Sequence, residues 1–443
     1  MSPEEKKAAR EREQRVRRIT GLLKEDEVAA MARRAAMTKR KLDLLDENDN
    51  FPVQCFAVPD PPGLGDAWED VDDETVDEDE AAARTAVNEE LRRKFLGWKS
   101  DGAYFQKLCR YDPAGFDALF ALAKDRLAET TLRGAVRANR TYRTHMLDDE
   151  LQFFITLHWL KFYPTYEQLR MTFGLHERHL AKYLFRVLKA LSHVLKDEVK
   201  LPSDEELIEM KEKQAQRGPE SMKNVLFAID GTELKIRAPV KKEYQRSHYS
   251  VKKKQYALNL LLLVTLDGRI AWSSGVNSKL QDQSIWNDSK IRSYFEERVG
   301  VGLVGDSGFT FNLKTKPNDP LISGLTPHKR PRKNAKSDAA SPSPSKLTDE
   351  QKKFNTELSR TRVVVENVNA RLKKWKIMRG PIRHFRHGKP SLISPELIVD
   401  VVVGLTAREL KTSPCRAADW TPKPVTQEDL DDNNNQESDD EEQ

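Results

Sequence analysis

Two aspartates stand at the ends of apolar segments, where a carboxylate could serve a catalytic centre. Asp230 follows the apolar run 225–229 and precedes Gly231, which lets a ligand approach the backbone closely. Asp306 follows a second apolar run at 301–304. A charge at the end of a buried strand is costly. Carboxylates that converge there are explained if they hold divalent cations, which offset their repulsion and prefer oxygen ligands.

A third carboxylate, Glu366, lies in a long helix predicted from residue 349 to about 377. Arg362 and Lys373, four residues before it and seven after it, share its helical face and could hold phosphates. Two Mg²⁺ or Mn²⁺ ions about 4 Å apart could clamp the attacking and leaving oxygens of a phosphoryl displacement. A single aspartate in this context is most often an ordinary strand-end or turn residue. The set of three carboxylates in these contexts is not explained in that way, and it predicts the catalytic residues and metal ligands of a phosphodiester-cleaving site.

The elements that must position these side chains form an α/β domain predicted over 222–410. Apolar runs and turn residues predict strands at 225–229, 234–238, 257–265, 269–273 and 301–304. Helical patterns are present at 284–299 and 397–410. The basic, Ser/Pro-rich stretch 328–348 is expected to be an inserted loop.

A helical region is predicted at 91–205, ahead of this domain. Its segment 149–195 has the layout of a helix-turn-helix, with a short helix, a turn at Gly174 and a longer second helix at 176–195. Four side chains of the second helix are expected to be exposed and to contact DNA phosphates or base edges: Arg178, His179, Lys182 and Arg186. Spacing alone favours an ordinary helical hairpin with a solvated basic face.

Charge is segregated along the chain. The 443 residues carry 75 Lys and Arg against 70 Asp and Glu, a net charge of +5. The segment 46–90 has a net charge of −15 and 427–443 one of −9, whereas the body at 91–426 carries 61 basic and 37 acidic residues. A body with a charge of +24 predicts a polyanionic partner, with DNA as the first candidate. The charged segment 1–90 and the tail 411–443 are expected to be largely disordered.

Several other classes of protein and site are disfavoured. Three scattered cysteines are too few for a disulfide framework or a metal cluster. No apolar run approaches about 18 residues, so no membrane partner is expected. The glycine-rich segment 300–305 leads into a strand instead of opening a helix, which argues against a dinucleotide site. The basic cluster 329–333 fits a nuclear localisation signal, with a solvated loop as the alternative.

Four segments, taken in order, resemble the DDE endonuclease domain of Harbinger-type transposases and their domesticated relatives. They read Ala228-Ile-Asp230-Gly-Thr-Glu233, Tyr249-Ser-Val-Lys252-Lys253-Lys254, Gly305-Asp306-Ser-Gly-Phe309 and Arg362-Val-Val-Val-Glu366-Asn-Val-Asn-Ala-Arg-Leu372-Lys373-Lys-Trp375. The last segment is also similar, more distantly, to the Tyr-x2-Arg-x3-Glu-x6-Lys signature of bacterial insertion-sequence transposases, with Ser359 in place of Tyr. The resemblance covers about residues 145–410, because that family also carries a helix-turn-helix ahead of the nuclease.

The resemblance implies a ribonuclease H-like mixed sheet with Asp230 on the first strand, Asp306 after the fourth and Glu366 on a later helix. It also implies DNA as the substrate, two Mg²⁺ or Mn²⁺ ions as cofactors and a separate Myb-like partner protein. Asp282 ends a segment that departs from the family's Gly-Ser-x-x-Asp and is a supporting candidate. Three consecutive lysines are expected to contact the DNA backbone: Lys252, Lys253 and Lys254.

The leading hypothesis is a nuclear, divalent-metal-dependent, transposase-derived DNA endonuclease. The first alternative is a host-adopted DNA-binding or scaffold protein that keeps the nuclease fold without activity. A third is an acidic-tailed adaptor that does not contact DNA. The sequence leaves a homo-oligomer open.

Overall fold

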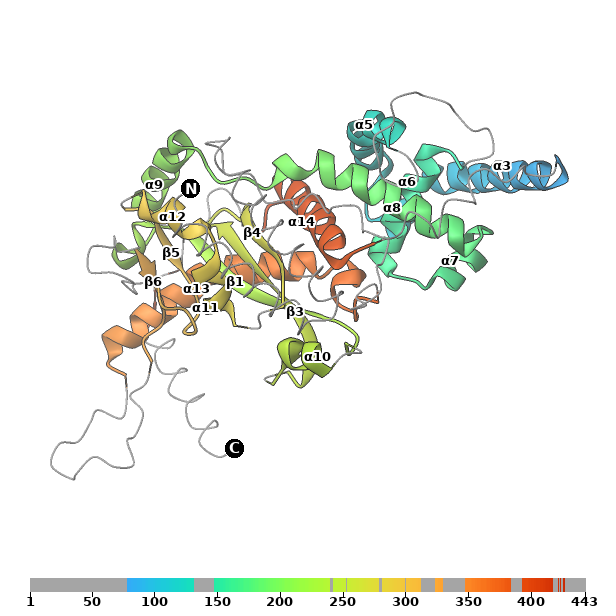
Figure 1. Cartoon of the computed structure of the whole chain (residues 1–443). Helices are drawn as coiled ribbons and strands as arrows, with labels where there is room; N and C mark the ends of the chain where they lie inside the picture. The colour runs from blue at the N-terminus through green and yellow to red at the C-terminus, as the bar shows by residue number, and fades with distance from the viewer. Residues whose placement is uncertain are drawn as a thin grey trace, which may run out of the picture. The chain divides into compact units, whose positions relative to one another are not determined.

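A computed structural model gives the arrangement of the chain (Figure 1). The structure describes residues 78–130, 147–239, 242–251, 253–278, 281–298, 300–311, 323–329, 347–383, 393–416, 421, 423, 425 and 426. All of them belong to one compact unit, Val53–Gln443. Four predictions fall outside the described residues: those for 1–77, for Lys252, for most of the loop 328–348 and for 427–443.

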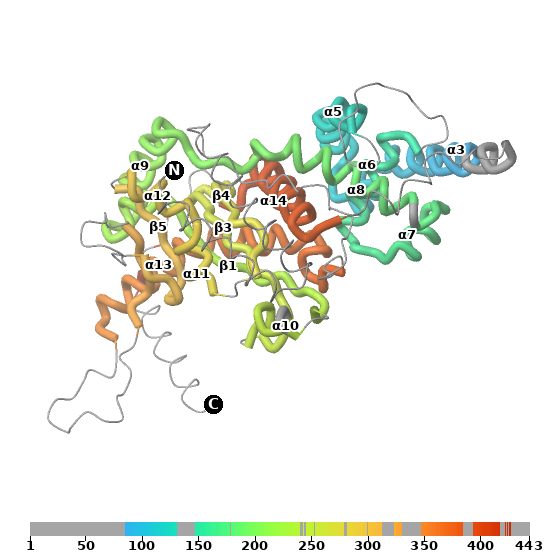
Figure 2. Tube along the Cα trace, in the orientation of Figure 1, coloured from blue at the N-terminus to red at the C-terminus, as the bar shows by residue number. Residues whose placement is uncertain are grey.

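Helices dominate the N-terminal part of the described chain (Figure 2). They are α3 (Glu78–Ser100), α4 (Gly102–Cys109), α5 (Pro113–Glu129), α6 (Asp149–Phe162), α7 (Tyr166–Phe173), α8 (Glu177–Val194), α9 (Asp204–Arg217) and the short 3-10 helices η2 (Lys196–Glu198) and η3 (Glu220–Met222). Capping side chains explain several helix starts. A hydrogen bond from a backbone N–H of the first turn is accepted by the side chains of Asp112, Asp148 and Thr165. Helix α3 begins inside the segment 1–90, so the prediction of disorder is wrong for its last residues.

A six-stranded mixed sheet follows. Its strands are β1 (Val225–Lys235), β2 (Tyr249–Ser250), β3 (Gln255–Thr265), β4 (Ile270–Asn277), β5 (Gly302–Val304) and β6 (Gly324–Leu325). The order is β2-β3-β1-β5-β6, with β4 also paired to β3. Strands β1, β3 and β4 pair antiparallel, whereas β5 pairs parallel with both β1 and β6. The predicted mixed α/β class is confirmed.

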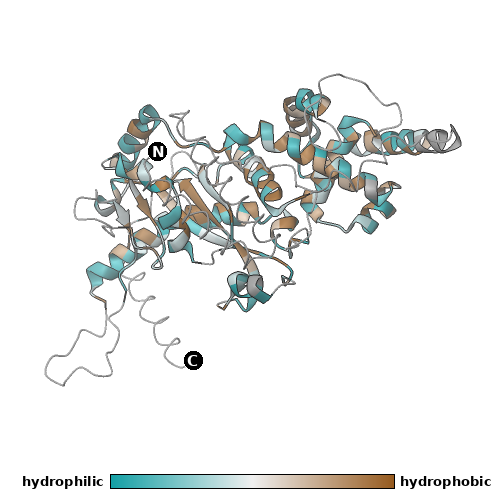
Figure 3. Ribbon diagram, viewed as in Figure 1, coloured by the Kyte–Doolittle hydropathy of each residue, from teal (hydrophilic) through white to brown (hydrophobic). Residues whose placement is uncertain are grey.

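Helices cover both faces of the sheet. The helices of this part are α10 (Lys242–His248), α11 (Asp282–Asp288), α12 (Ile291–Glu296), α13 (Asp349–Leu372), η4 (Lys376–Met378) and α14 (Pro395–Thr412). Apolar side chains of α13 and α14 form one core with strand residues such as Leu260 and Leu262. Strand residues such as Phe227 and Leu263 form a second core with α9, α11 and α12. The central strands are accordingly among the most hydrophobic parts of the chain (Figure 3).

Four predicted elements need correction. Strand β1 is a single element running through Asp230 to Lys235, where the sequence predicted two short strands. Asp230 therefore lies inside a strand and not at its end, because β3 pairs with β1 on both sides of it. The helix predicted at 284–299 is divided between α11 and α12. Helix α13 ends at Leu372, earlier than the predicted residue 377, and α14 extends to Thr412.

Candidate active site

Asp230 is held on the face of β1 that α13 covers. Its Oδ2 accepts a hydrogen bond of 3.1 Å from Asn369 Nδ2. Its Oδ1 lies 3.7 Å from Nη1 of Arg362. Both partners belong to α13, which packs against β1. The first predicted carboxylate therefore faces the helix that carries the third.

Glu366 is linked to Asp230 by the side chain of Arg362. The other guanidinium nitrogen of Arg362, Nη2, lies 2.7 Å from Glu366 Oε1. The two residues are four positions apart on α13, which is the spacing that brings side chains together on a helix. The guanidinium of Arg362 thus lies between Glu366 and Asp230. The prediction that Arg362 and Glu366 share a helical face is confirmed.

Asp306 follows β5, the parallel neighbour of β1. Ala228 of β1 pairs with Val304 of β5, and the two aspartates come two residues after these partners. The pairing brings Asp306 to the neighbourhood of Asp230. The Asp306 carboxylate is oriented locally, since its Oδ1 accepts a hydrogen bond of 2.8 Å from the Gly308 backbone N–H.

Asp282 packs directly against the backbone of β1. A Cβ atom at Gly231 would lie only 2.1 Å from Asp282 Oδ1, so a residue with a side chain cannot occupy that position without displacing the carboxylate. Asn259 Nδ2 of β3 donates a hydrogen bond of 2.5 Å to the same oxygen. Gly231 was predicted to allow close approach, and the approaching group is this carboxylate.

Electrostatics link these groups into one site. The pKa of Asp230 is raised to about 6, mainly by burial and also by the negative charges of Asp282, Asp306 and Glu366, against the opposing charge of Arg362. Only neighbouring charges can act in this way in a partly solvated site. The three predicted carboxylates and Asp282 therefore share one neighbourhood around Asp230.

The donor chemistry of this site fits hard divalent cations. Carboxylate oxygens are the ligands that Mg²⁺ and Mn²⁺ prefer, and four carboxylates in one neighbourhood repel each other unless positive charge is added. No three His, Cys, Asp or Glu side chains meet as a ready-made metal site among the residues that the structure describes. Arg362 balances the charge of Asp230 and Glu366 instead. The carboxylates fit divalent cations by their chemistry. In this structure, however, the guanidinium of Arg362 occupies the space beside Asp230 and Glu366.

Two lysines lie beside the carboxylates. Lys373 follows the last turn of α13, and its pKa is lowered by burial and by the charge of Lys253, against the charges of Asp230 and Glu233. Lys253 Nζ lies 3.6 Å from Glu233 Oε2. Lys254 is exposed. Lys253 and Lys373 therefore place positive charge near Asp230 and Glu233.

The predicted DNA-reading helix has its expected bounds but not its expected exposure. Gly174, with a φ of 71°, ends α7 before α8 begins. The expected exposure is wrong for Lys182 and Arg186, which are 8% and 4% exposed. Arg186 is turned inward because its guanidinium pairs with Asp149 at 2.5 Å and donates to buried oxygens. His179 is half-buried, and the side chain of Arg178 is outside the description.

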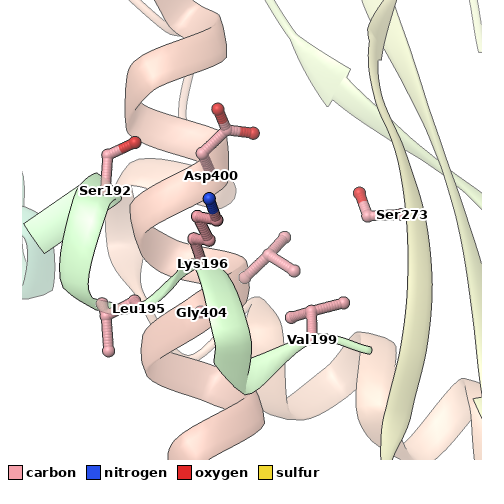
Figure 4. A pocket seen from close by; sticks show the side chains of 8 residues that line it. Ser192, Leu195, Lys196, Val199, Ser273, Asp400 and Gly404 are labelled. Carbon is pink, nitrogen blue, oxygen red and sulfur yellow. The ribbon is translucent and has the colours of Figure 1, made fainter. Parts of the chain in front are cut away.

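A separate small pocket lies away from the carboxylates (Figure 4). Side chains of α8, η2, β4 and α14 line it, among them Ser192, Lys196, Ser273 and Asp400. Burial and the charge of Glu396 raise the pKa of Asp400 to about 7. None of the predicted site residues that the structure describes lines this pocket, so we do not count it as part of the candidate active site.

Sequence reasoning missed two asparagines that hold the aspartates. Asn369 lies three residues after Glu366, a spacing that places both on one face of a helix and could have identified it. Asn259 reaches Asp282 only through the pairing of β3 with β1, which no local signal reveals.

Comparison with known proteins shows two similarities. Residues 229–406 match the family described as DDE superfamily endonuclease, a span that includes all the carboxylates of the site. The chain is also 26% identical over 246 residues to the probable transposase for insertion sequence element IS702 of Microchaete diplosiphon. This similarity covers 55% of the chain and 76% of the relative. No solved structure matches the chain significantly. Both similarities support a DDE transposase family.

Proposed function

We propose that the chain is a divalent-metal-dependent DNA endonuclease of the Harbinger type, derived from a transposase. The observation that carries the proposal is that Asp306 and Glu366 lie near the half-buried Asp230, Asp306 through the pairing of β1 with β5 and Glu366 through Arg362, within the span that matches the endonuclease family. The order of the sheet supports a ribonuclease H-like fold, since antiparallel strands occupy one side of β1 and parallel strands the other.

In this proposal the chain's own residues hold and orient the reacting groups. Asp230, Asp306 and Glu366 would hold two divalent cations, and Asp282 supports the site beside Gly231. The cations, when bound, supply Lewis-acid activation and charge neutralisation for in-line displacement at a phosphodiester. Lys373 is placed to bind a phosphate. Arg362 can do the same once it exchanges its carboxylate partners for a phosphate.

DNA is the proposed partner of the basic body. The charge of +24 on residues 91–426 supports backbone binding, with Lys253 and Lys254 as contacts beside the carboxylates. A nuclear location and a Myb-like partner protein remain part of the proposal through the family resemblance. No helix in the described part is long and apolar enough to cross a membrane. We do not propose Arg186 as a DNA contact, because its guanidinium is buried.

The proposal is tested by incubating the full-length chain with DNA that contains a transposon-like end and with Mg²⁺ or Mn²⁺. Metal-dependent nicking is expected from the wild type and from the control Asp125→Asn, an exposed residue on α5. Asp230→Asn is expected to lose the activity, by at least about 1,000-fold, because it removes a charge that the cations require.

Binding without nicking by the wild type would favour the catalytically silent DNA-binding protein. Equal nicking by Asp230→Asn would show that the site lies elsewhere. Absence of DNA affinity would leave the adaptor hypothesis.

A further inference from the structure

Asn369 is a buried polar residue in the wall of the carboxylate site. The residue is 7% exposed, on a face of α13 that otherwise buries apolar residues such as Val365, Val368 and Leu372. Its Nδ2 donates to Asp230 Oδ2 at 3.1 Å. An aliphatic residue would suit this environment, so the amide needs an explanation other than packing.

The carbonyl oxygen of the Asn369 amide also argues against a packing role. Asn369 Oδ1 is buried and has no hydrogen-bond partner among the residues that the structure describes. An unsatisfied buried acceptor costs stability, and such groups are retained where function requires them. The buried Oδ1 of Asn369 therefore opposes folding, while its Nδ2 holds the carboxylate of Asp230.

The neutrality of the amide distinguishes Asn369 from the other partner of Asp230. Arg362 also contacts Asp230, but its positive charge competes with a cation for that carboxylate. Asn369 holds Oδ2 without adding charge, so the attraction of Asp230 for a cation is retained. The bond also fixes the orientation of the carboxylate, which leaves Oδ1 on the side that Arg362 occupies.

We propose that Asn369 is a positioning residue of the carboxylate site, which holds Asp230 by Oδ2 and thereby presents Oδ1 to a divalent cation. The proposal rests on the proposed function, since it requires that Asp230 bind a cation. Hydrogen-bond partners of metal ligands orient the ligand, and their loss costs 10- to 100-fold in metal affinity. Asn369 acts through Asp230 and does not itself contact the reacting phosphate.

The test measures binding of Mn²⁺ alone to the full-length chain by titration calorimetry, without DNA. Asn369→Leu keeps the volume of the side chain and removes the donor, and Asn369→Ala removes both. Asn367→Ala is the matched control, because Asn367 is an exposed asparagine of the same helix. We expect the Kd for Mn²⁺ to rise about 10- to 100-fold in both Asn369 variants and to stay unchanged in the control.

Thermal unfolding without metal separates positioning from a structural role. We expect Asn369→Leu to unfold cooperatively, with a Tm close to that of the wild type, while its affinity for Mn²⁺ falls. An unchanged Kd in a folded Asn369→Leu or Asn369→Ala variant would overturn the proposal. Equal Mn²⁺ binding by wild type and Asp230→Asn, or no binding by either, would overturn the proposed function and this inference with it. If Asp230→Asn weakens Mn²⁺ binding but the Asn369 variants do not, this inference is overturned and the proposed function is not.

Discussion

The burial of Asp230, the carboxylate proposed as catalytic, opposes the stability of the fold. Its pKa rises from 3.8 to about 6, mainly through burial. Because the folded pKa exceeds the unfolded one, the folded state binds the proton more tightly, and stability falls as the pH rises from about 4 to about 6. Above that range the cost is fully present. In the proposed site, the charge that would bind a cation is thus kept at the expense of folding.

Asp230→Asn should therefore stabilise the metal-free protein at neutral pH while it abolishes nicking. A pKa rise from 3.8 to about 6 corresponds to about 3 kcal/mol, which is the upper bound of the expected gain in the free energy of unfolding. The gain should shrink as the pH falls from 6 to 4, because the wild-type carboxyl becomes protonated. Urea unfolding of wild type and variant across this pH range is the measurement. A gain that does not depend on pH would contradict the assigned cause.

Arg186, which was predicted to contact DNA, is a charged residue that stabilises the fold. Its guanidinium is bound by Asp149, Gln152 and backbone carbonyls inside the helical region. Truncation to Ala would leave these buried oxygens without a donor. We expect Arg186→Ala to lower the free energy of unfolding by about 3–5 kcal/mol, as judged by chemical denaturation. The exposed Arg170→Ala should change it little. Equal stability of the two variants would restore a surface role for Arg186.

At the scale of elements, the site is made where β1, α11 and α13 meet. Strand β1 supplies Asp230 and Gly231, α11 begins with Asp282, and α13 supplies the groups that hold Asp230. The sequence predicted each of these carboxylates and the helical face shared by Arg362 and Glu366. It could not predict that β1 continues past Asp230, because the pairing partner in β3 is remote in the chain.

Gly231→Ala tests the junction of β1 and α11. The added Cβ would meet Asp282 Oδ1 at 2.1 Å, so the carboxylate and the start of α11 must shift. We expect nicking to fall about 100-fold, as for a displaced supporting group, and the free energy of unfolding to fall by about 1–3 kcal/mol. Gly97→Ala in α3 is the control, since nothing lies within 4 Å of its Cβ position. That change should stabilise the helix by about 0.5–1 kcal/mol and leave nicking intact. Full activity of Gly231→Ala would show that Asp282 has no part in the site.

At the scale of the whole molecule, charge is unevenly distributed along the chain. The body at 91–426 is strongly basic, and acidic segments flank it in the sequence. Negative charge inside the body gathers at Asp230, with Lys253 and Lys373 beside it. Under the proposed function, this arrangement would suit a DNA backbone that lies next to the carboxylate site.

The salt dependence of DNA binding measures how many phosphates this surface engages. The logarithm of the affinity should fall linearly with the logarithm of the salt concentration, with a slope of about −0.9 for each phosphate contacted. Lys253→Ala should weaken binding and reduce the slope by about 1. Lys213→Ala, on α9 and exposed, should leave the slope unchanged. A slope near zero for the wild type would count against DNA as the partner.

The amino-acid sequence by itself determined the class of fold and most of the helices, and it singled out the carboxylates of the candidate site. Local signals suffice for these features, because helix caps, apolar periodicity and residue spacing act between neighbours in the chain. Only the tertiary structure decided that Asp230 lies within a strand, that Arg186 points inward and that Asn369 holds Asp230. These outcomes depend on strand pairing and helix packing between segments that are remote in sequence, which no local pattern encodes.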